Sequence, residues 1–232
     1  MGRTVIVGDV HACTSELEDL LDAVRFQGDD RLVLVGDLVV RGPDPHGTLA
    51  LIRQLGGRAV RGNHEGKLLA WRHRHKAIGP DHERVANVLT DAEWQMLEKL
   101  PFWLDLPEHG VRVVHAGVLP GLPIHRVPPE ALMKMRTIDG RTWSAEGNAG
   151  PLWGTLYKGP PHVVFGHNAH PGPQFHPWAT GIDTGCVYGG RLTALVLEEG
   201  EPVPRGTKVR RLLASVQARR RYYGTKGGPM SR

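Results

Sequence analysis

Short runs of aliphatic and β-branched residues recur along the chain, separated by polar or glycine-containing turns. The runs 4–7 (TVIV) and 32–35 (LVLV) are continuously apolar, as expected for strands that are buried on both faces. Each is followed by a segment with apolar residues at helical spacing, over 15–25 and 45–55, and Thr14 or Ser15 is placed to cap the first of these helices. This half of the chain therefore predicts a β-α-β-α arrangement.

The second half has a different pattern. A helix after Glu65 and a mostly helical stretch over 82–100 end the first half, and long segments rich in glycine and proline follow, which are typical of ordered loops over a sheet edge. The apolar runs between these loops predict strands over 111–114, 163–165 and 192–197. Together, the two halves predict an α/β fold.

Composition supports a globular protein of the cytoplasm. The chain has 232 residues, 40% hydrophobic and 23% charged, which excludes a disordered or collagen-like chain. Cys13 and Cys186 are too few for a disulfide scaffold and are compatible with a reducing compartment. No apolar run approaches the ~20 residues that cross a bilayer, and the N-terminus lacks the apolar core of a signal peptide, so we expect a cytoplasmic protein without a membrane partner.

The net charge of +5 is unevenly distributed. Residues 202–232 contain nine Lys or Arg and no Asp or Glu, so residues 1–201 carry a net charge of −4. We therefore expect a mildly acidic domain over 1–201, followed by a basic C-terminal tail over 202–232 that is a solvated extension. A tail of this kind does not by itself predict specific nucleic-acid binding.

Side chains able to bind metals follow almost every expected strand. In α/β sheets, sites form outside the carboxyl ends of the strands, so residues far apart in the chain can converge there. Each residue alone has an ordinary explanation as a turn residue or a buried histidine, but their recurrence in chain order indicates a site. The residues are Asp9, His11, Asp37, Asn63, His64, His115 and His167.

The residue types suit a site with two divalent cations. A central carboxylate such as Asp37 can bridge two ions, while imidazoles and an amide oxygen complete their coordination. This mixed nitrogen and oxygen set suits Mn, Fe or Zn, and the chain has no cysteine cluster for a softer site. Paired ions deprotonate water near neutral pH and clamp the attacking and leaving oxygens of a displacement at phosphorus.

The same residues carry a family resemblance. The chain resembles the calcineurin-like metallophosphoesterases, and within them the phosphoprotein phosphatase branch, over about residues 4–198. The segment 182–195 further resembles the closing segment of diadenosine tetraphosphatase-like members. The resemblance implies a four-layer α/β/β/α sandwich with two mixed β-sheets. The motifs that carry it are GDVH at 8–11, GDLVVRG at 36–42, GNHE at 62–65, HAG at 115–117 and GH at 166–167.

The resemblance also implies a role for each residue. His64 would be the general acid that protonates the leaving oxygen, and Arg41 and Asn63 would bind phosphate oxygens. Arg136 is a further phosphate-binding candidate on its position alone. The two ions would be Mn²⁺, with Fe, Zn, Co or Ni as alternatives. One would be held by Asp9, His11 and Asp37, and the other by Asp37, Asn63, His115 and His167.

One position departs from the family pattern. Val40 stands where the motif has a second aspartate, which orients the catalytic histidine. Its loss should leave His64 less firmly oriented unless another carboxylate substitutes. The candidates for that substitution are Asp44, Glu65 and Asp183.

Several histidines outside the motifs lack ligand spacing. We interpret His73, His75, His82 and His109 as ordinary surface or helix residues. The run 72–76 (RHRHK) is interpreted as a solvated helix face, with contact to an anionic substrate as the alternative if it faces the cleft.

From these features we expect a metal-dependent phosphohydrolase that uses a metal-bound hydroxide and no phosphoenzyme. The segment 182–195 favours a dinucleoside polyphosphate, such as diadenosine tetraphosphate, cut symmetrically to two ADP. A protein Ser/Thr or dual-specificity phosphatase is the alternative, because the same residues would serve a phosphoprotein substrate. A third hypothesis is a metal-binding regulator, in which Val40 marks a weakened site.

Overall fold

Two five-stranded mixed sheets form the centre of the computed structural model, which describes residues 2–140 and 142–224. The first sheet has the strand order β12-β11-β1-β2-β3. The neighbouring strands β1, β2 and β3 are parallel, β11 runs antiparallel to β1, and β12 runs antiparallel to β11. The strands are β1 (Thr4–Val7), β2 (Arg31–Leu34), β3 (Arg58–Ala59), β11 (Arg191–Leu197) and β12 (Leu213–Gln217).

The second sheet has the order β4-β5-β8-β10-β9. Strands β5, β8 and β10 are parallel, and the two edge strands β4 and β9 are antiparallel to their neighbours. The strands are β4 (Trp103–Leu106), β5 (Val111–Val114), β8 (His162–Phe165), β9 (Gln174–Phe175) and β10 (Ala179–Gly181).

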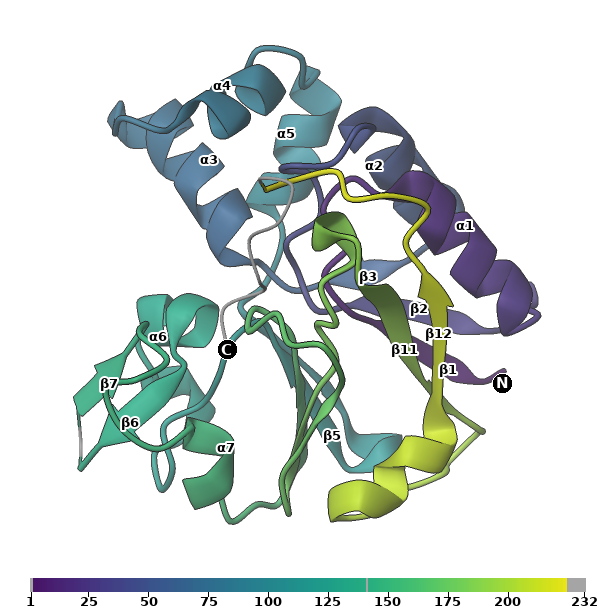
Figure 1. The fold of residues 1–232 in the computed structure, drawn as a ribbon, viewed down its shortest axis with the longest axis vertical. Coiled ribbons are helices and arrows are strands. Elements are labelled where there is room, and N and C mark those ends of the chain that lie inside the picture. Colours follow the sequence, from purple (N-terminus) through teal and green to yellow (C-terminus); the bar gives the residue numbers. More distant parts are fainter. Residues whose placement is uncertain (1, 141, 225–232) are drawn as a thin grey trace.

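The continuous apolar runs of the sequence are explained by burial on both faces of each sheet. In β1, Ile6 belongs to the core between the two sheets, together with Val113 and Val164 of the second sheet. Its neighbours Val5 and Val7 point the other way, into the core under the outer helices. All three side chains have no exposed surface. The two sheets and the helices outside them therefore form the expected layered sandwich (Figure 1).

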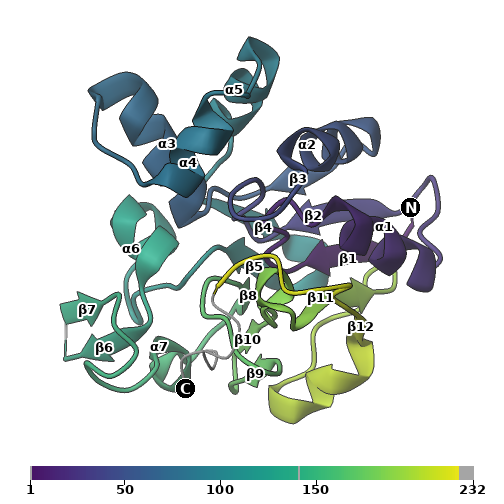
Figure 2. The ribbon, with the colours of Figure 1, turned by 45° about the horizontal axis from the view of Figure 1, so that its top comes forward.

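Helices of the first half of the chain cover the first sheet. Two of them, α1 (Thr14–Ala23) and α2 (Pro45–Gln54), pack Leu17 and Ile52 into the outer core. The expected cap of α1 is wrong, because Cys13 occupies the N-cap and no side chain caps the helix. The remaining three, α3 (Asn63–Arg74), α4 (Pro80–Ala86) and α5 (Asp91–Glu98), form a group that rises from the edge of the sandwich (Figure 2).

Short elements cover the second sheet. Leu132 and Trp153 pack with Phe165 of β8 in a third core cluster. Among the described residues, no helix is long and apolar enough to cross a membrane. The elements on this side are α6 (Pro129–Lys134), β6 (Thr137–Asp139), β7 (Thr142–Ser144) and α7 (Trp153–Leu156), and the 3-10 helices of the chain are η1 (Pro107–His109), η2 (Ile124–Arg126), η3 (Cys186–Tyr188) and η4 (Gly206–Leu212).

The expectation of a solvated basic tail is wrong for residues 202–224. Strand β12 completes the edge of the first sheet by pairing with β11, and Val209 before it is fully buried. Beyond the strand, Arg219 forms an ion pair with Asp19 of α1. The apolar residues between the basic ones pack onto the sandwich, which a count of charges cannot detect. Residues 225–232 of the predicted tail lie outside the described residues.

Candidate active site

The predicted site residues follow the ends of five elements that meet at one edge of the two sheets. Asp9 and His11 follow β1, and Asp37 follows β2. Asn63 and His64 open α3 after β3, His115 follows β5, and His167 follows β8. Parallel strands end at the same edge of their sheet, so the topology itself brings these residues together.

The turns that carry these side chains have unusual backbone conformations. His11, Asp37 and His167 all have positive φ angles, of 50°, 51° and 66°. Such conformations cost a non-glycine residue roughly 1 kcal/mol or more and are kept where the surrounding structure enforces them. Gly62 faces this crowding directly, because a Cβ at that position would collide with Asp37 Oδ1. The loops are thus built to place particular side chains at the sheet edge.

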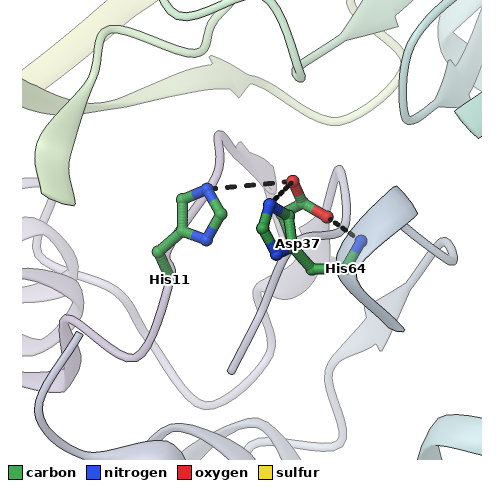
Figure 3. A group of neighbouring side chains, drawn as sticks. All are labelled: His11, Asp37 and His64. Atoms are coloured by element: carbon green, nitrogen blue, oxygen red, sulfur yellow. Dashed lines mark hydrogen bonds and ion pairs between the residues drawn. The ribbon is translucent and has the colours of Figure 1, made fainter. Parts of the chain in front are cut away.

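Asp37 lies at the centre of the site. Its Oδ2 is 3.8 Å from His11 Nε2, 3.9 Å from His64 Nε2 and 3.3 Å from His115 Nε2. The rings of His11 and His64 both direct a nitrogen at this carboxylate (Figure 3). Glu65 fixes the loop from beneath, since its carboxylate accepts hydrogen bonds from the backbone N–H groups of Asp37, Leu38 and Gly62.

Three histidines present a lone pair to the centre of the site. His11 Nδ1 is 2.9 Å from the carbonyl oxygen of Val40, and His115 Nδ1 is 2.8 Å from that of Val35. His167 uses its other nitrogen, with Nε2 at 3.1 Å from the carbonyl oxygen of Lys134. Because a carbonyl only accepts, each of these nitrogens carries the proton, and the opposite nitrogen has a free lone pair.

The imidazole nitrogens that face the centre of the site lie close to oxygen atoms that are themselves acceptors. His167 Nδ1 lies 2.7 Å and His115 Nε2 lies 3.1 Å from Asn63 Oδ1, and Asp37 Oδ2 faces the same point. Turning the Asn63 amide would place its NH₂ group on all three acceptors, so the position calls for a positively polarised partner. A divalent cation that prefers nitrogen and oxygen ligands meets that demand, and the residues present therefore fit a metal site.

The ionisation of the site is consistent with cation binding. Burial acts to raise the pKa of Asp37, but the imidazoles of His115 and His64 lower it well below its ordinary value. The pKa of Asp9 is raised, first by burial and then by the charges of Asp183 and Asp37. Burial also lowers the pKa of His11 to about 4. Burial acts to lower the pKa of His115 too, but the charge and hydrogen bond of Asp37 raise it above its ordinary value. The site thus crowds carboxylates together, and a cation would relieve their repulsion.

The structure brings all six predicted metal ligands to one place. Two groups of possible ligand atoms, each within 4.8 Å of one another, share Asp37: one with His11 and His64, the other with His115 and His167. Asn63 contacts the second group. Asp9 joins the site through its carboxylate, which accepts a hydrogen bond from the backbone N–H of His167. Their roles as ligands remain a prediction.

The two predicted phosphate-binding arginines lie on different sides of the site. Arg41 donates a hydrogen bond to the Tyr188 hydroxyl, and its guanidinium lies 4.9 Å from the ring centre of Tyr223. Arg136 lies near His167, whose pKa its charge lowers after the larger effect of burial. Arg136 Nε is buried and has no hydrogen-bond partner among the described residues, and the role of Arg136 toward phosphate stays a prediction.

His82 is the site residue that the sequence did not predict. Its Nε2 is 3.0 Å from His64 Nδ1, and the side chain is 8% exposed. None of the three carboxylates considered above as partners of His64 hydrogen-bonds to the His64 ring. Asp44 caps α2, Glu65 accepts from backbone N–H groups, and Asp183 accepts from the N–H of Gly185. The only sequence signal for His82 was its place on the apolar face of a helix, beside Val85 and Ala86.

Comparisons with known proteins agree with this geometry. A solved structure of a candidate diadenosine tetraphosphatase superposes with a TM-score of 0.82 at 38% identity, covering 94% of each chain. The asymmetrical bis(5'-nucleosyl)-tetraphosphatase PrpE of Halalkalibacterium halodurans is 30% identical over 84% of this chain and 90% of its own. The symmetrical bis(5'-nucleosyl)-tetraphosphatase of Shewanella sediminis is 38% identical, but over 54% of this chain and 48% of its own.

The family model that matches the chain extends over nearly all of the sandwich. It is the calcineurin-like phosphoesterase model, and it matches residues 2–200. This span contains every residue of the predicted metal site. The chain is a hydrolase of the metallophosphoesterase type and belongs to the calcineurin-like phosphoesterase family.

Proposed function

We propose that the protein hydrolyses diadenosine tetraphosphate, or a closely related dinucleoside polyphosphate, symmetrically to two nucleoside diphosphates. The observation that carries the proposal is the position of Asp37, which is shared by two sets of possible ligand atoms, one with His11 and His64 and the other with His115 and His167. Relatives named as bis(5'-nucleosyl)-tetraphosphatases support the substrate class. The resemblance of the segment 182–195 to diadenosine tetraphosphatase-like members supports the same substrate class.

Two divalent cations, with Mn²⁺ as the preferred ion, belong to this proposal. Bound there, they would supply Lewis-acid polarisation of water and of the phosphate oxygens. Asp37 is the shared ligand in this assignment. The first ion would be held by Asp9, His11 and Asp37, and the second by Asp37, Asn63, His115 and His167.

The chain's own residues supply the remaining chemistry. His64 Nε2 faces the Asp37 carboxylate and so lies where it can deliver a proton to the leaving oxygen. Arg41 offers a planar fork of N–H donors for the non-bridging phosphate oxygens, and Arg136 is a further candidate for the same role. Asn63 contributes its amide to the same surface. These groups neutralise and orient the phosphate that is cut.

Product analysis tests the proposal. The protein loaded with Mn²⁺ is incubated with diadenosine tetraphosphate, and the nucleotides are separated by ion-exchange chromatography. ADP as the sole nucleotide product supports the symmetrical cut, whereas equal amounts of AMP and ATP would replace it with an asymmetrical one. A panel of phosphopeptides is assayed in parallel. A higher kcat/KM for any phosphopeptide than for the dinucleotide would overturn the substrate assignment in favour of a protein phosphatase.

A further inference from the structure

A groove leads away from the metal-ligand end of the site, between α3 and α6. It has a volume of about 790 Å³, and Asn63 lies on its wall. Residues of both helices line it. Such a volume is within the range of small-molecule sites. We call it the α3–α6 groove.

Cationic side chains dominate the polar lining of this groove. Glu98 and Glu130 are its only acidic residues among those described, and Glu98 already pairs with His73 at 2.9 Å. The cationic lining consists of Arg61, Lys67, Arg74, Lys76 and Lys134. This groove is therefore positive although residues 1–201 as a whole are acidic. Part of the run 72–76, interpreted from sequence as a solvated face, borders the groove.

Two of the lysines link the groove to the catalytic residues. The backbone carbonyl of Lys134 accepts the hydrogen bond from His167 Nε2. Lys67 stands three residues after His64 in α3, and so close to the same face of that helix. Farther out, Arg61 lies over the ring of Phe102, and its buried Nε has no partner among the described residues. An anion extending from the metals would meet these groups in succession.

We propose that the α3–α6 groove binds the part of a dinucleoside polyphosphate that lies beyond the cleaved bond. This inference rests on the proposed function. A tetraphosphate chain carries about four negative charges, and bound metals would neutralise only part of this charge, so the remainder calls for a separate cationic surface. Apolar side chains of Ile78, Phe102 and Met133 in the same groove supply a surface for a nucleobase.

Substitution of Lys67 and Lys134 by glutamine tests this assignment. The readout is the ratio of kcat/KM for diadenosine tetraphosphate to kcat/KM for p-nitrophenyl phosphate, which has nothing to place in the groove. We expect the double variant to lower this ratio at least tenfold, mainly through KM for the dinucleotide. The matched control is Lys158→Gln, an exposed lysine outside the groove lining, which should keep the wild-type ratio.

The outcomes separate the groove from the proposed function. If the wild-type protein hydrolyses diadenosine tetraphosphate and the ratio stays within twofold, the groove assignment is wrong while the function stands. If the wild-type protein hydrolyses p-nitrophenyl phosphate but no dinucleoside polyphosphate, both are wrong. A fall in phosphopeptide turnover without any dinucleotide activity would assign the groove to an acidic peptide instead.

A second inference rests on a different observation, the contact between His64 and His82. We infer that His82 is the positioning residue for His64. It would do the work of the motif's second aspartate, whose position in this chain is occupied by Val40. The two imidazole rings are nearly parallel, at 3°, with Nε2 of one 3.0 Å from Nδ1 of the other. One N–H therefore points at the other ring's lone pair, which fixes the plane of His64 and directs its Nε2 toward Asp37.

The origin of His82 makes this arrangement distinct. The residue comes from α4, whereas all of the motif residues come from the sheet edge and the start of α3. Unlike a carboxylate, a neutral imidazole orients its partner without adding negative charge near the phosphate. Val40 contributes only its backbone carbonyl, which accepts from His11 Nδ1. The orienting role thus moves from a motif loop to a neighbouring helix.

Variants at both positions test the inference with p-nitrophenyl phosphate, so the result does not depend on the natural substrate. We expect His82→Phe, which keeps a ring but loses the hydrogen bond, to lower kcat at least tenfold with KM within twofold. His82→Gln, which keeps a hydrogen-bonding group, should recover part of the loss. Adding Val40→Asp to His82→Phe should recover more than Val40→Asp gains in the wild-type background.

A purely structural role for His82 gives the opposite pattern. In that case, the loss of kcat would track the loss of folded protein in thermal unfolding, and Val40→Asp would give the same factor in both backgrounds. Either result would overturn the inference. An unchanged kcat in a folded His82→Phe protein would overturn it as well.

Discussion

The metal-ligand cluster and the walls around it are built in different ways. Every cluster residue stands directly after a strand or at the start of α3, so the sheet topology alone fixes its position. The walls come from α4, α6 and the segment after β12, which reach the site through helix packing. The side chains that carry the predicted chemistry thus come from strand ends, whereas the groups that surround them come from elements outside the motifs.

Asp37→Asn is the change that should damage the cluster most. The amide removes the shared negative charge and leaves His11 and His115 without the carboxylate they face. Metal ions supply several kcal/mol of transition-state stabilisation, so kcat/KM should fall about 10⁴-fold. Steady-state kinetics and metal content by mass spectrometry check this together. A variant that retains both ions and most of its activity would show that the two halves of the cluster do not depend on Asp37.

His64→Ala separates catalysis from metal binding within the cluster. A general acid contributes about 10²-fold or more, so kcat should fall by at least that factor. The bound metal should be retained, because the proposed ligands remain in place. Kinetics and metal analysis on the same preparation check both statements. Since Nε2 of His64 lies 3.9 Å from Asp37 Oδ2, loss of an ion in this variant would instead identify His64 as a ligand.

His162→Gln tests the scaffold behind the cluster. Burial lowers the pKa of His162 to about 4, and its Nδ1 has no partner among the described residues. A histidine with a lowered pKa binds fewer protons when folded, so its contribution to stability is complete above pH 6.5 and is lost as the pH falls from 6.5 to 4. The shift corresponds to at most about 3 kcal/mol in the free energy of unfolding.

Denaturant unfolding at pH 7 and pH 4 measures this contribution. The buried histidines of the site also make the free energy of unfolding depend on pH, so the quantity of interest is the difference in this dependence between wild type and variant. Thr180→Val is the control, because it removes the hydrogen-bond partner of His162 but keeps the imidazole ring. The variant should lose less stability than the wild type between the two pH values. An identical loss in both proteins would show that His162 is accessible to protons in the folded state.

The different origins of the cluster and the walls also explain what could be predicted from sequence. Buried parallel strands give continuous apolar runs, so β1, β2 and the residues after them were evident, and their motifs indicated the whole ligand set. The contact of His82 with His64 could not be predicted, because it depends on how α4 packs against α3. The edge strand β12 could not be predicted for a related reason: its short apolar run lies between the basic runs 210–211 and 219–221, which dominate the composition of 202–232.

Tyr223→Ala is the smallest effect and the sharpest test of the C-terminal wall. The ring lies 4.9 Å from the guanidinium of Arg41, while its backbone N–H donates to the carbonyl of Val187 and so holds the segment in place. A cation–π contact at a partly exposed site contributes about 1 kcal/mol, so kcat/KM should fall about fivefold as Arg41 becomes less ordered. Tyr222→Phe is the matched control, because Tyr222 bonds Glu16 and does not face Arg41. Equal losses of kcat/KM in the two variants would mean that the segment after β12 acts only by covering α1. An increase in kcat/KM for Tyr223→Ala would mean that the Tyr223 ring holds Arg41 away from the phosphate.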